Sequence, residues 1–218
     1  MALCFAELSV IADTPADRRR RQRMVRDQLA DCVDPRVVAA MGELPRHAFL
    51  PAGLEAGAYD DTARAIGAGQ TISQPRIVAR MLAALRVQSG ERVLDVGAGS
   101  GYAAALLARL AAPGRVLALE RQGDLIAATA ARLTQLAPTV ELRHADGLAP
   151  GEEQFDVIHV AAACSERPTA LLARLAPGGR LIAPVGPHDG VQRLLLVDAA
   201  GDTWLDEVLF VPGLPGTV

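Results

Sequence analysis

The chain is poor in cysteine, in aromatic residues and in long apolar runs. Three of its 218 residues are cysteines, Cys4, Cys32 and Cys164, and aromatic side chains make up 3%. An odd number of cysteines without a C-x-x-C pair provides no disulfide framework and is typical of a reducing compartment. No apolar run approaches the ~20 residues that a membrane span needs. Because 50% of the residues are hydrophobic, we expect one main domain that folds without disulfides or metal.

The chain also lacks the marks of a secretion signal and of a nucleic-acid-binding protein. Its first twelve residues include Glu7, have no basic leader and run into Asp13 without a convincing cleavage site. The net charge is −3 and the isoelectric point is near 5.8, whereas nucleic-acid binding normally needs a basic face. We interpret the basic block Arg18–Arg21 as the solvated start of a helix. The sequence therefore predicts a cytoplasmic protein with no nucleic-acid or membrane partner, and it favours a monomer.

Metal ligands and a reactive cysteine are not expected. The histidines show no metal-ligand spacing; they are His47, His144, His159 and His188. Cys164 follows Ala161-Ala162-Ala163, without the preceding proline that is common beside nucleophilic cysteines. We interpret it as a small buried hydrophobe. The same run stands where enzymes that methylate bases usually carry an Asn/Asp-Pro-Pro-aromatic segment, so we do not predict that activity. From the histidine spacing, we predict no metal site.

From residue 91 onward, strand-like and helix-like segments alternate. The expected strands are 91–96, 115–119, 138–143, 155–162 and 179–185, and the expected helices between them are 101–111, 123–136 and 168–175. This alternation predicts a parallel sheet with helices on both faces. Two further strand-like runs, 192–197 and 204–211, predict a hairpin that adds antiparallel strands at one edge. The expected fold is α/β, with a doubly wound, mostly parallel seven-stranded sheet and an N-terminal helical extension.

The extension is expected to contain two helices and a long connection. The helices are predicted near 17–32 and from the Asp34-Pro35 cap to Met41. Prolines and glycines between Leu44 and Gly69 interrupt any long periodicity, and long connections of this kind tend to be functional. A further helix is predicted to begin at Pro75, because apolar residues follow it at helical spacing.

The most informative stretch is Val93–Tyr102, where a buried strand runs into a glycine-rich turn and a helix. Glycines at 97, 99 and 101 let the backbone bend sharply beside a ligand, and the helix start presents unpaired N–H groups. A dinucleotide fingerprint would need glycine at 102, where this chain has tyrosine. The spacing instead resembles the first motif of class I S-adenosylmethionine-dependent methyltransferases, and a nicotinamide dehydrogenase is the least fitting alternative.

Ligands of parallel sheets lie beyond the carboxyl ends of the strands. The polar or small residues expected there, in chain order, are Asp95, Gly97, Gly99, Ser100, Gly101, Glu120, Asp146 and Gly147. Glu120 could accept hydrogen bonds from both hydroxyls of a ribose, and Asp146-Gly147 could hold an adenine edge. The other notable stretch is Gly67–Pro75, GAGQTISQP, just before the first sheet unit. Taken alone, Ser73 or Thr71 could simply cap the helix that Pro75 begins.

Together these motifs resemble protein-L-isoaspartate (D-aspartate) O-methyltransferases, and the resemblance covers most of the chain. The segment Gln70–Pro75 at this distance from the glycine turn is a highly specific combination. Further matching positions are Met24-Val25, Gln28-Leu29, Val37–Met41, Pro45-Arg46, Phe49, Pro51, Ala58-Tyr59, Asp61, Phe155-Asp156, Leu175, Pro177–Arg180, Pro184–Gly186 and Phe210–Pro212.

The resemblance implies methyl transfer from S-adenosyl-L-methionine to the free carboxylate of L-isoaspartyl or D-aspartyl residues in damaged proteins, which initiates their repair. It implies Ser73 as the active-site residue and Gln70, Thr71 and Ile72 beside the cofactor, with the strand-end residues named above. Phe210, Val211 and Pro212 would pair with the peptide substrate. Residues 1–75 would then form N-terminal helices and a loop that covers the site, and residues 76–218 the methyltransferase core.

The chain departs from the family pattern at Arg76, Arg174 and Gly213, which raises the question of substrate affinity. Two alternatives use the same fold. One is a methyltransferase of a small organic acid, which Arg76 could bind. The other is a non-catalytic module that binds damaged protein. The presence of Gln70, Thr71 and Ser73 favours an enzyme.

Overall fold

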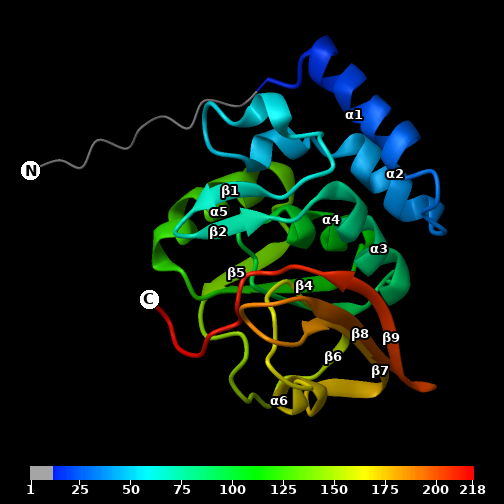
Figure 1. Ribbon diagram of the computed structural model, residues 1–218, viewed down its shortest axis with the longest axis vertical. Helices are drawn as coiled ribbons and strands as arrows, with labels where there is room; N and C mark the ends of the chain where they lie inside the picture. The colour runs from blue at the N-terminus through cyan, green and yellow to red at the C-terminus, as the bar shows by residue number, and fades with distance from the viewer. Residues whose placement is uncertain (1–11) are drawn as a thin grey trace, which may run out of the picture.

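The computed structural model describes residues 12–218 (Figure 1). Cys4 and most of the apolar first segment, on which the leader prediction depends, lie outside the described residues. The N-terminal elements are helices α1 (Pro15–Gln28) and α2 (Pro35–Glu43), 3-10 helices η1 (Arg46–Phe49) and η2 (Glu55–Gly57), the short strands β1 (Arg64–Gly67) and β2 (Gln70–Ile72), and helix α3 (Pro75–Leu85).

The remaining elements build the main sheet. They are β3 (Arg92–Val96), α4 (Tyr102–Ala111), β4 (Arg115–Glu120), α5 (Gly123–Leu136), β5 (Val140–His144), β6 (Phe155–Val160), α6 (Thr169–Leu172), β7 (Leu175–Val185), β8 (Gln192–Asp198) and β9 (Gly201–Val208). The strand order is β5-β4-β3-β6-β7-β8-β9. The pairs from β5 to β7 are parallel, and β8 and β9 add antiparallel pairs. The predicted seven-stranded sheet and its edge hairpin are confirmed.

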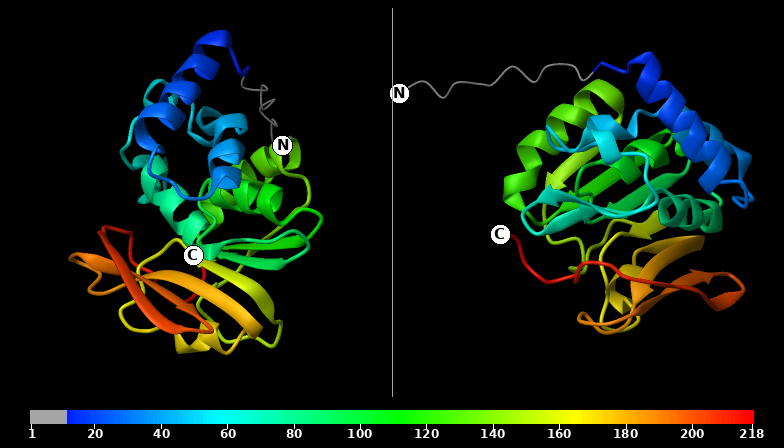
Figure 2. Two further views of the ribbon diagram at one scale, coloured as in Figure 1. Left: turned by 90° about the vertical axis from the view of Figure 1, so that its right-hand side faces the viewer. Right: turned by 45° about the horizontal axis from the view of Figure 1, so that its top comes forward.

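The two faces of the sheet carry separate apolar clusters, because successive side chains of a strand point to opposite faces. Val93 packs with the cluster under α3, α4 and α5, whereas Leu94 and Val96 belong to the other. α6 packs on β7 beneath the second cluster. Figure 2 shows α1 and α2 stacked outside α3 and α4, away from the sheet. The larger cluster combines residues from before and after position 75, and the division of the chain there stays a prediction.

The stretch expected to be an irregular connection contains a β-hairpin. β1 and β2 pair antiparallel, with Gly67 opposite Gln70, so Ala68 and Gly69 form a two-residue turn. Both turn residues have positive φ, 49° and 69°, as in the tight turns that match the twist of a hairpin. The segment that carries Gln70 and Thr71 is therefore a strand, and the N-cap residue of α3 is Gln74, which makes no side-chain capping hydrogen bond. The interpretation of Ser73 or Thr71 as a mere helix cap is wrong.

Two other boundaries, and the burial of one arginine, differ from the prediction for identifiable reasons. α6 covers only Thr169–Leu172, because Leu175 already pairs with Phe155 and begins β7. β9 ends at Val208, which pairs with the first residue of β8 and leaves the chain beyond it without a partner strand. In the basic block, Arg21 is buried rather than solvated: it donates to Asp13, to the Gly42 carbonyl and to Tyr59.

Within residues 12–218, no helix combines the length and the apolar character that a membrane crossing requires.

Candidate functional site

The turn between β3 and α4 bends tightly at its three glycines. Gly97, Gly99 and Gly101 have φ values of 82°, 53° and 89°, in the left-handed backbone region that residues other than glycine rarely adopt. A Cβ at Gly101 would also lie 3.1 Å from Leu133 of α5. Thr129, likewise on α5, donates a hydrogen bond of 2.6 Å to the Gly99 carbonyl. The turn is fixed by its own conformation and by α5, a contact that the motif does not reveal.

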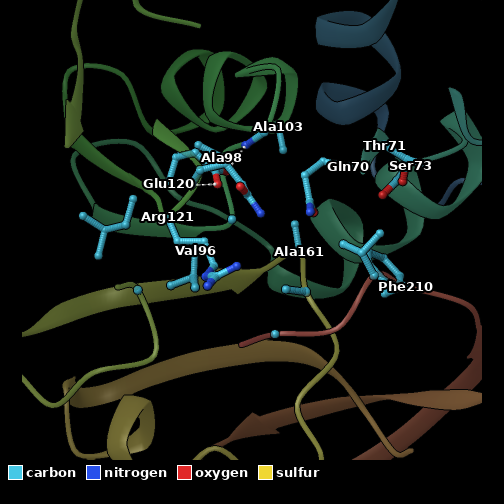
Figure 3. A pocket seen from close by; sticks show the side chains of 18 of the residues that line it. Gln70, Thr71, Ser73, Val96, Ala98, Ala103, Glu120, Arg121, Ala161 and Phe210 are labelled. Carbon is cyan, nitrogen blue, oxygen red and sulfur yellow. Dashed lines mark hydrogen bonds between the residues drawn. The ribbon is translucent and has the colours of Figure 1, made fainter. Parts of the chain in front are cut away.

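Glu120 connects this turn to the end of β4. Its carboxylate is 4% exposed and accepts two backbone hydrogen bonds, from Gly99 N–H at 2.7 Å and from Gln122 N–H at 2.8 Å. Each carboxylate oxygen has a second lone pair, so the group can accept further hydrogen bonds. Glu120 lies at one end of a cavity, next to Arg121 (Figure 3). The arrangement suits a ligand with neighbouring hydroxyl groups.

Asp95 is fully buried beneath the same turn. It is paired in register with His159 on the adjacent strand β6, and its Oδ1 lies 2.7 Å from His159 Nδ1. Its Oδ2 has no hydrogen-bond partner among the described residues. A buried polar atom without a partner is uncommon in folded proteins. His159 lines the cavity, so it presents a polar group there while Asp95 lies beneath it. No sequence motif indicated His159.

Asp146 contacts the C-terminal segment of the chain. Its Oδ1 accepts from Leu148 N–H at 2.9 Å and its Oδ2 from Gly216 N–H at 2.7 Å. Arg121 donates to the Gly216 carbonyl at 2.9 Å, and its own carbonyl accepts from Val218 N–H. Leu214 lines the cavity. The segment 213–218 thus closes the cavity beside Asp146, a role that the sequence did not predict.

The segment Gln70–Ser73 forms another wall of the cavity and is supported from below by Arg46. This arginine is fully buried and donates to the Ala58 carbonyl and to the Ser73 carbonyl, both at 2.7 Å. Its guanidinium lies 5.0 Å from the centre of the Tyr102 ring. Burial lowers the pKa of Arg46 to about 10, so the side chain is still charged at neutral pH. Arg46, which does not line the cavity, therefore fixes the backbone of Ser73.

The segment Phe210–Gly213 lies opposite Ser73. Val211 accepts from Ala163 N–H and Gly213 N–H donates to the Ala163 carbonyl, each at 2.8 Å, so the segment is attached to the chain just after β6. A Cβ at Gly213 would lie 2.9 Å from that carbonyl oxygen. Glycine at 213 is therefore required by this close approach, and a leucine there would clash.

The cavity, which we call the main cavity, brings together nearly all of the residues predicted for the site. Glu120 and Arg121 lie at one end, and Thr71, Ser73 and Phe210 at the other (Figure 3). The predicted residues that line it are Gln70, Thr71, Ile72, Ser73, Gly97, Gly99, Ser100, Glu120, Asp146, Gly147, Phe210, Val211 and Pro212. Asp95 and Gly101 are buried beneath it rather than in its lining.

Of the three positions that depart from the family pattern, Gly213 lines the main cavity, whereas Arg76 and Arg174 do not. Arg76 forms an ion pair with Asp61 at 3.2 Å, and its backbone N–H also donates to that carboxylate. Arg174 donates to the Glu153 carbonyl and covers the Phe155 ring. The geometry therefore gives no support to Arg76 as the ligand of a small acid.

Cys164 is buried at the far side of β6, and burial raises the pKa of its thiol to about 11. A thiol with a raised pKa is a poor nucleophile. Cys32 and Cys164 are both free of disulfides. Among the described residues, no three side chains of His, Cys, Asp or Glu gather as metal ligands would. The absence of a metal site stays a prediction.

Comparison with known proteins gives one family. Residues 19–214 match the family described as "Protein-L-isoaspartate(D-aspartate) O-methyltransferase (PCMT)". A protein-L-isoaspartate O-methyltransferase of Methylorubrum populi is 48% identical over 205 residues, which are 90% of this chain and 95% of that protein. Protein-L-isoaspartate O-methyltransferase 1 of Rhodopseudomonas palustris is 45% identical over 210 residues, 92% of this chain and 85% of the relative.

A solved structure resembles the whole fold. It is that of a protein from Plasmodium falciparum, described as a putative protein-L-isoaspartate O-methyltransferase in complex with S-adenosyl-L-homocysteine. The TM-score is 0.76 at 27% sequence identity, and the match covers 91% of this chain and 98% of that one.

Proposed function

Because the chain belongs to the protein-L-isoaspartate(D-aspartate) O-methyltransferase family, we propose that one end of its main cavity binds the cofactor and the other end binds the substrate. The enzyme transfers a methyl group from S-adenosyl-L-methionine to the free carboxylate of isoaspartyl residues in damaged proteins. The observation that carries the proposal is that one cavity joins the acid Glu120 to Ser73 and Phe210.

The end of the main cavity near Glu120 fits the nucleoside and amino-acid parts of the cofactor. Glu120 has lone pairs left for two ribose hydroxyls, and Asp146 with Gly147 would border the adenine. Gly97, Gly99 and Ser100 of the glycine turn would meet the amino-acid tail, while Asp95 and Gly101, buried beneath the lining, would support this part of the cofactor site. When bound, the cofactor supplies a methyl group on a positively charged sulfur. Gln70, Thr71 and Ile72 would cover it from the hairpin side.

We assign Ser73 an orienting role at the other end. An isoaspartyl carboxyl group has a reference pKa near 4, so it is ionised at neutral pH and needs no general base. The Ser73 hydroxyl would hold the carboxylate by a hydrogen bond, in line with the methyl group, and orientation of this kind supplies several kcal/mol. Arg46 fixes the Ser73 backbone, which keeps the hydroxyl in place. Because charge is lost in the transition state, the apolar rim formed by Ile72 and Phe210 helps by excluding water.

Phe210–Pro212 would recognise the peptide backbone. An isoaspartyl residue differs from aspartyl in where the extra methylene lies, so a chain segment that pairs as a strand can distinguish the two. Val211 is attached on one side to Ala163, and the segment continues beyond the last ladder pair of β9 at Val208. Substrates would therefore be isoaspartyl residues in exposed, extended chain. A cytoplasmic location and a monomeric state stay predictions.

The test is methyl transfer to two synthetic peptides that differ only in an aspartyl or an isoaspartyl linkage. With labelled S-adenosyl-L-methionine, we expect base-labile methylation of the isoaspartyl peptide and none of the aspartyl peptide. Methylation of a small organic acid in place of both peptides would overturn the proposal. So would binding of the cofactor without transfer to either peptide.

A further inference from the structure

A second opening adjoins the main cavity at Ser73, and we call it the side cleft. It is lined by Ser73, Ile77, Val191, Glu207, Leu209 and Phe210, among others. Ser73 and Phe210 also line the main cavity, so the two spaces adjoin at these residues. A peptide whose isoaspartyl carboxylate lies at Ser73 must continue into a neighbouring space. The side cleft is such a space.

The walls of the side cleft carry two large apolar side chains that are open to solvent. Val191 is 53% exposed and Leu209 is 78% exposed, and they come from the two segments that flank the cleft. Single exposed apolar residues are common on protein surfaces. Here, however, both line the same cleft, beside the residue proposed to hold the substrate. Glu207 lines it too, and within the described chain no arginine does.

A buried glutamine holds both walls in place. Gln192 is 1% exposed, and its side chain makes three hydrogen bonds, all to backbone groups. Its Nε2 donates to the carbonyls of Pro187 and Gly190, both at 2.7 Å, which closes the loop that leads into Val191. Its Oε1 accepts from Phe210 N–H at 2.8 Å. One side chain thus links the loop before Val191 to the segment that carries Leu209 and Phe210.

We propose that Val191 and Leu209 form a subsite for an apolar side chain next to the isoaspartyl residue, and that Gln192 is the positioning residue that sets this subsite. The inference deepens the proposed function and rests on it, since it places the reacting carboxylate at Ser73. An apolar side chain next to the isoaspartyl residue is stabilised when it leaves water and is buried between Val191 and Leu209. An acidic neighbour gains no cation there and meets Glu207.

The first experiment compares peptides that differ only in one neighbour of the isoaspartyl residue, Leu or Glu, placed before it in one series and after it in another. For the unmodified enzyme we expect kcat/KM to favour Leu over Glu by about tenfold in at least one series. In the double variant Val191→Ser, Leu209→Ser, the preference should fall to about twofold or less. The control is Val33→Ser, Leu54→Ser, which removes exposed apolar side chains that line neither space. It should keep the full preference.

Equal kcat/KM for Leu and Glu peptides in both series would overturn the subsite. A preference that survives in the double variant would do the same. These outcomes differ from failure of the proposed function, in which the unmodified enzyme would methylate no isoaspartyl peptide at all.

The second experiment tests Gln192 with Gln192→Met, and with Gln192→Glu, which keeps the size and loses the donors. We expect the KM for the Leu peptide to rise about tenfold in both variants, while the dissociation constant of S-adenosyl-L-homocysteine changes less than twofold. Gln88→Met, at an exposed position, should change neither. A purely structural role would lower kcat and weaken cofactor binding along with peptide binding, and that result would overturn the assignment.

Discussion

The two ends of the main cavity are built in different ways. At the Glu120 end, the groups come from strand ends and from the turn that follows β3, and the backbone N–H groups of Gly99 and Gln122 hold the acid. At the Ser73 end, the wall consists of a short hairpin and an extended segment, each fixed by one buried side chain, Arg46 for the first and Gln192 for the second. The first end is thus built on a glycine turn and strand-end acids that sequence motifs mark, and the second depends on two buried polar side chains that lie outside those motifs. Substitutions at the Glu120 end should therefore change cofactor affinity, and substitutions at the Ser73 end should change the kinetics with the peptide.

The largest expected effect is on cofactor affinity in Glu120→Ala. The substitution removes the proposed acceptor of the ribose hydroxyls and leaves Gly99 N–H and Gln122 N–H without their partner. We expect the dissociation constant of S-adenosyl-L-homocysteine, measured by calorimetry, to rise roughly 100-fold, because hydrogen bonds to a charged group are the strong ones. Glu141→Ala, on the outer strand β5, serves as the control. An unchanged affinity in Glu120→Ala would remove the assigned role.

Arg46→Met should damage the Ser73 end instead. The carbonyls of Ala58 and Ser73 would lose their buried donor, so we expect a loss of about 3 kcal/mol in unfolding free energy. In the folded fraction, kcat/KM for the isoaspartyl peptide should fall about 20-fold with little change in cofactor affinity. Arg174→Met is the matched control, because Arg174 is also buried and also covers an aromatic ring. It should cost stability without this selective loss, and an equal loss in both variants would speak against Arg46 as a support of Ser73.

Ser73→Ala should have a smaller effect, confined to the peptide. Loss of one hydrogen bond to the ionised carboxylate corresponds to about 1.5 kcal/mol, or roughly a tenfold fall in kcat/KM for the isoaspartyl peptide. Cofactor affinity and melting temperature should stay as they are, and Ser165→Ala at an exposed position should match the unmodified enzyme throughout. Full turnover with unchanged peptide affinity in Ser73→Ala would eliminate the orienting role.

The smallest expected effect is a gain in stability at the hairpin turn. Ala68 has a φ of 49°, which is unfavourable for a residue with a Cβ, whereas asparagine tolerates this region. Ala68→Asn should stabilise the fold by up to about 1 kcal/mol and raise the melting temperature by roughly 2–4 °C. Gly69→Ala, at φ 69° in the same turn, should shift it in the opposite direction. A fall in melting temperature for Ala68→Asn would contradict the turn geometry.

The same contrast explains what the sequence predicted and what it did not. The glycine turn, the strand-end acid and the alternation of strands and helices are local patterns, and they predicted the sheet and the Glu120 end. The hairpin was missed because its strands are only four and three residues long, in a stretch rich in glycine. The sequence signal that could have revealed the hairpin is the Ala68-Gly69 pair, which lies between Ile66 and Ile72.

The supports of the Ser73 end left no local signal. Gln192 is one polar residue at the start of an apolar strand, and its three partners lie two to eighteen positions away. Arg46 stood in a matching family segment, but its link to Ser73 spans 27 positions. The short C-terminal segment 213–218 likewise carries no local pattern that predicts its contacts with Arg121 and Asp146. Gly213, a departure from the family pattern, is a requirement of backbone packing against Ala163.

The most direct test is a crystal structure of the enzyme with S-adenosyl-L-homocysteine and an isoaspartyl peptide. We expect the ribose hydroxyls to bind Glu120, the isoaspartyl carboxylate to lie about 3 Å from Ser73 Oγ, and the peptide backbone to lie along Phe210–Pro212. A carboxylate bound at Arg76, or a peptide that avoids the 210–212 segment, would contradict this expectation.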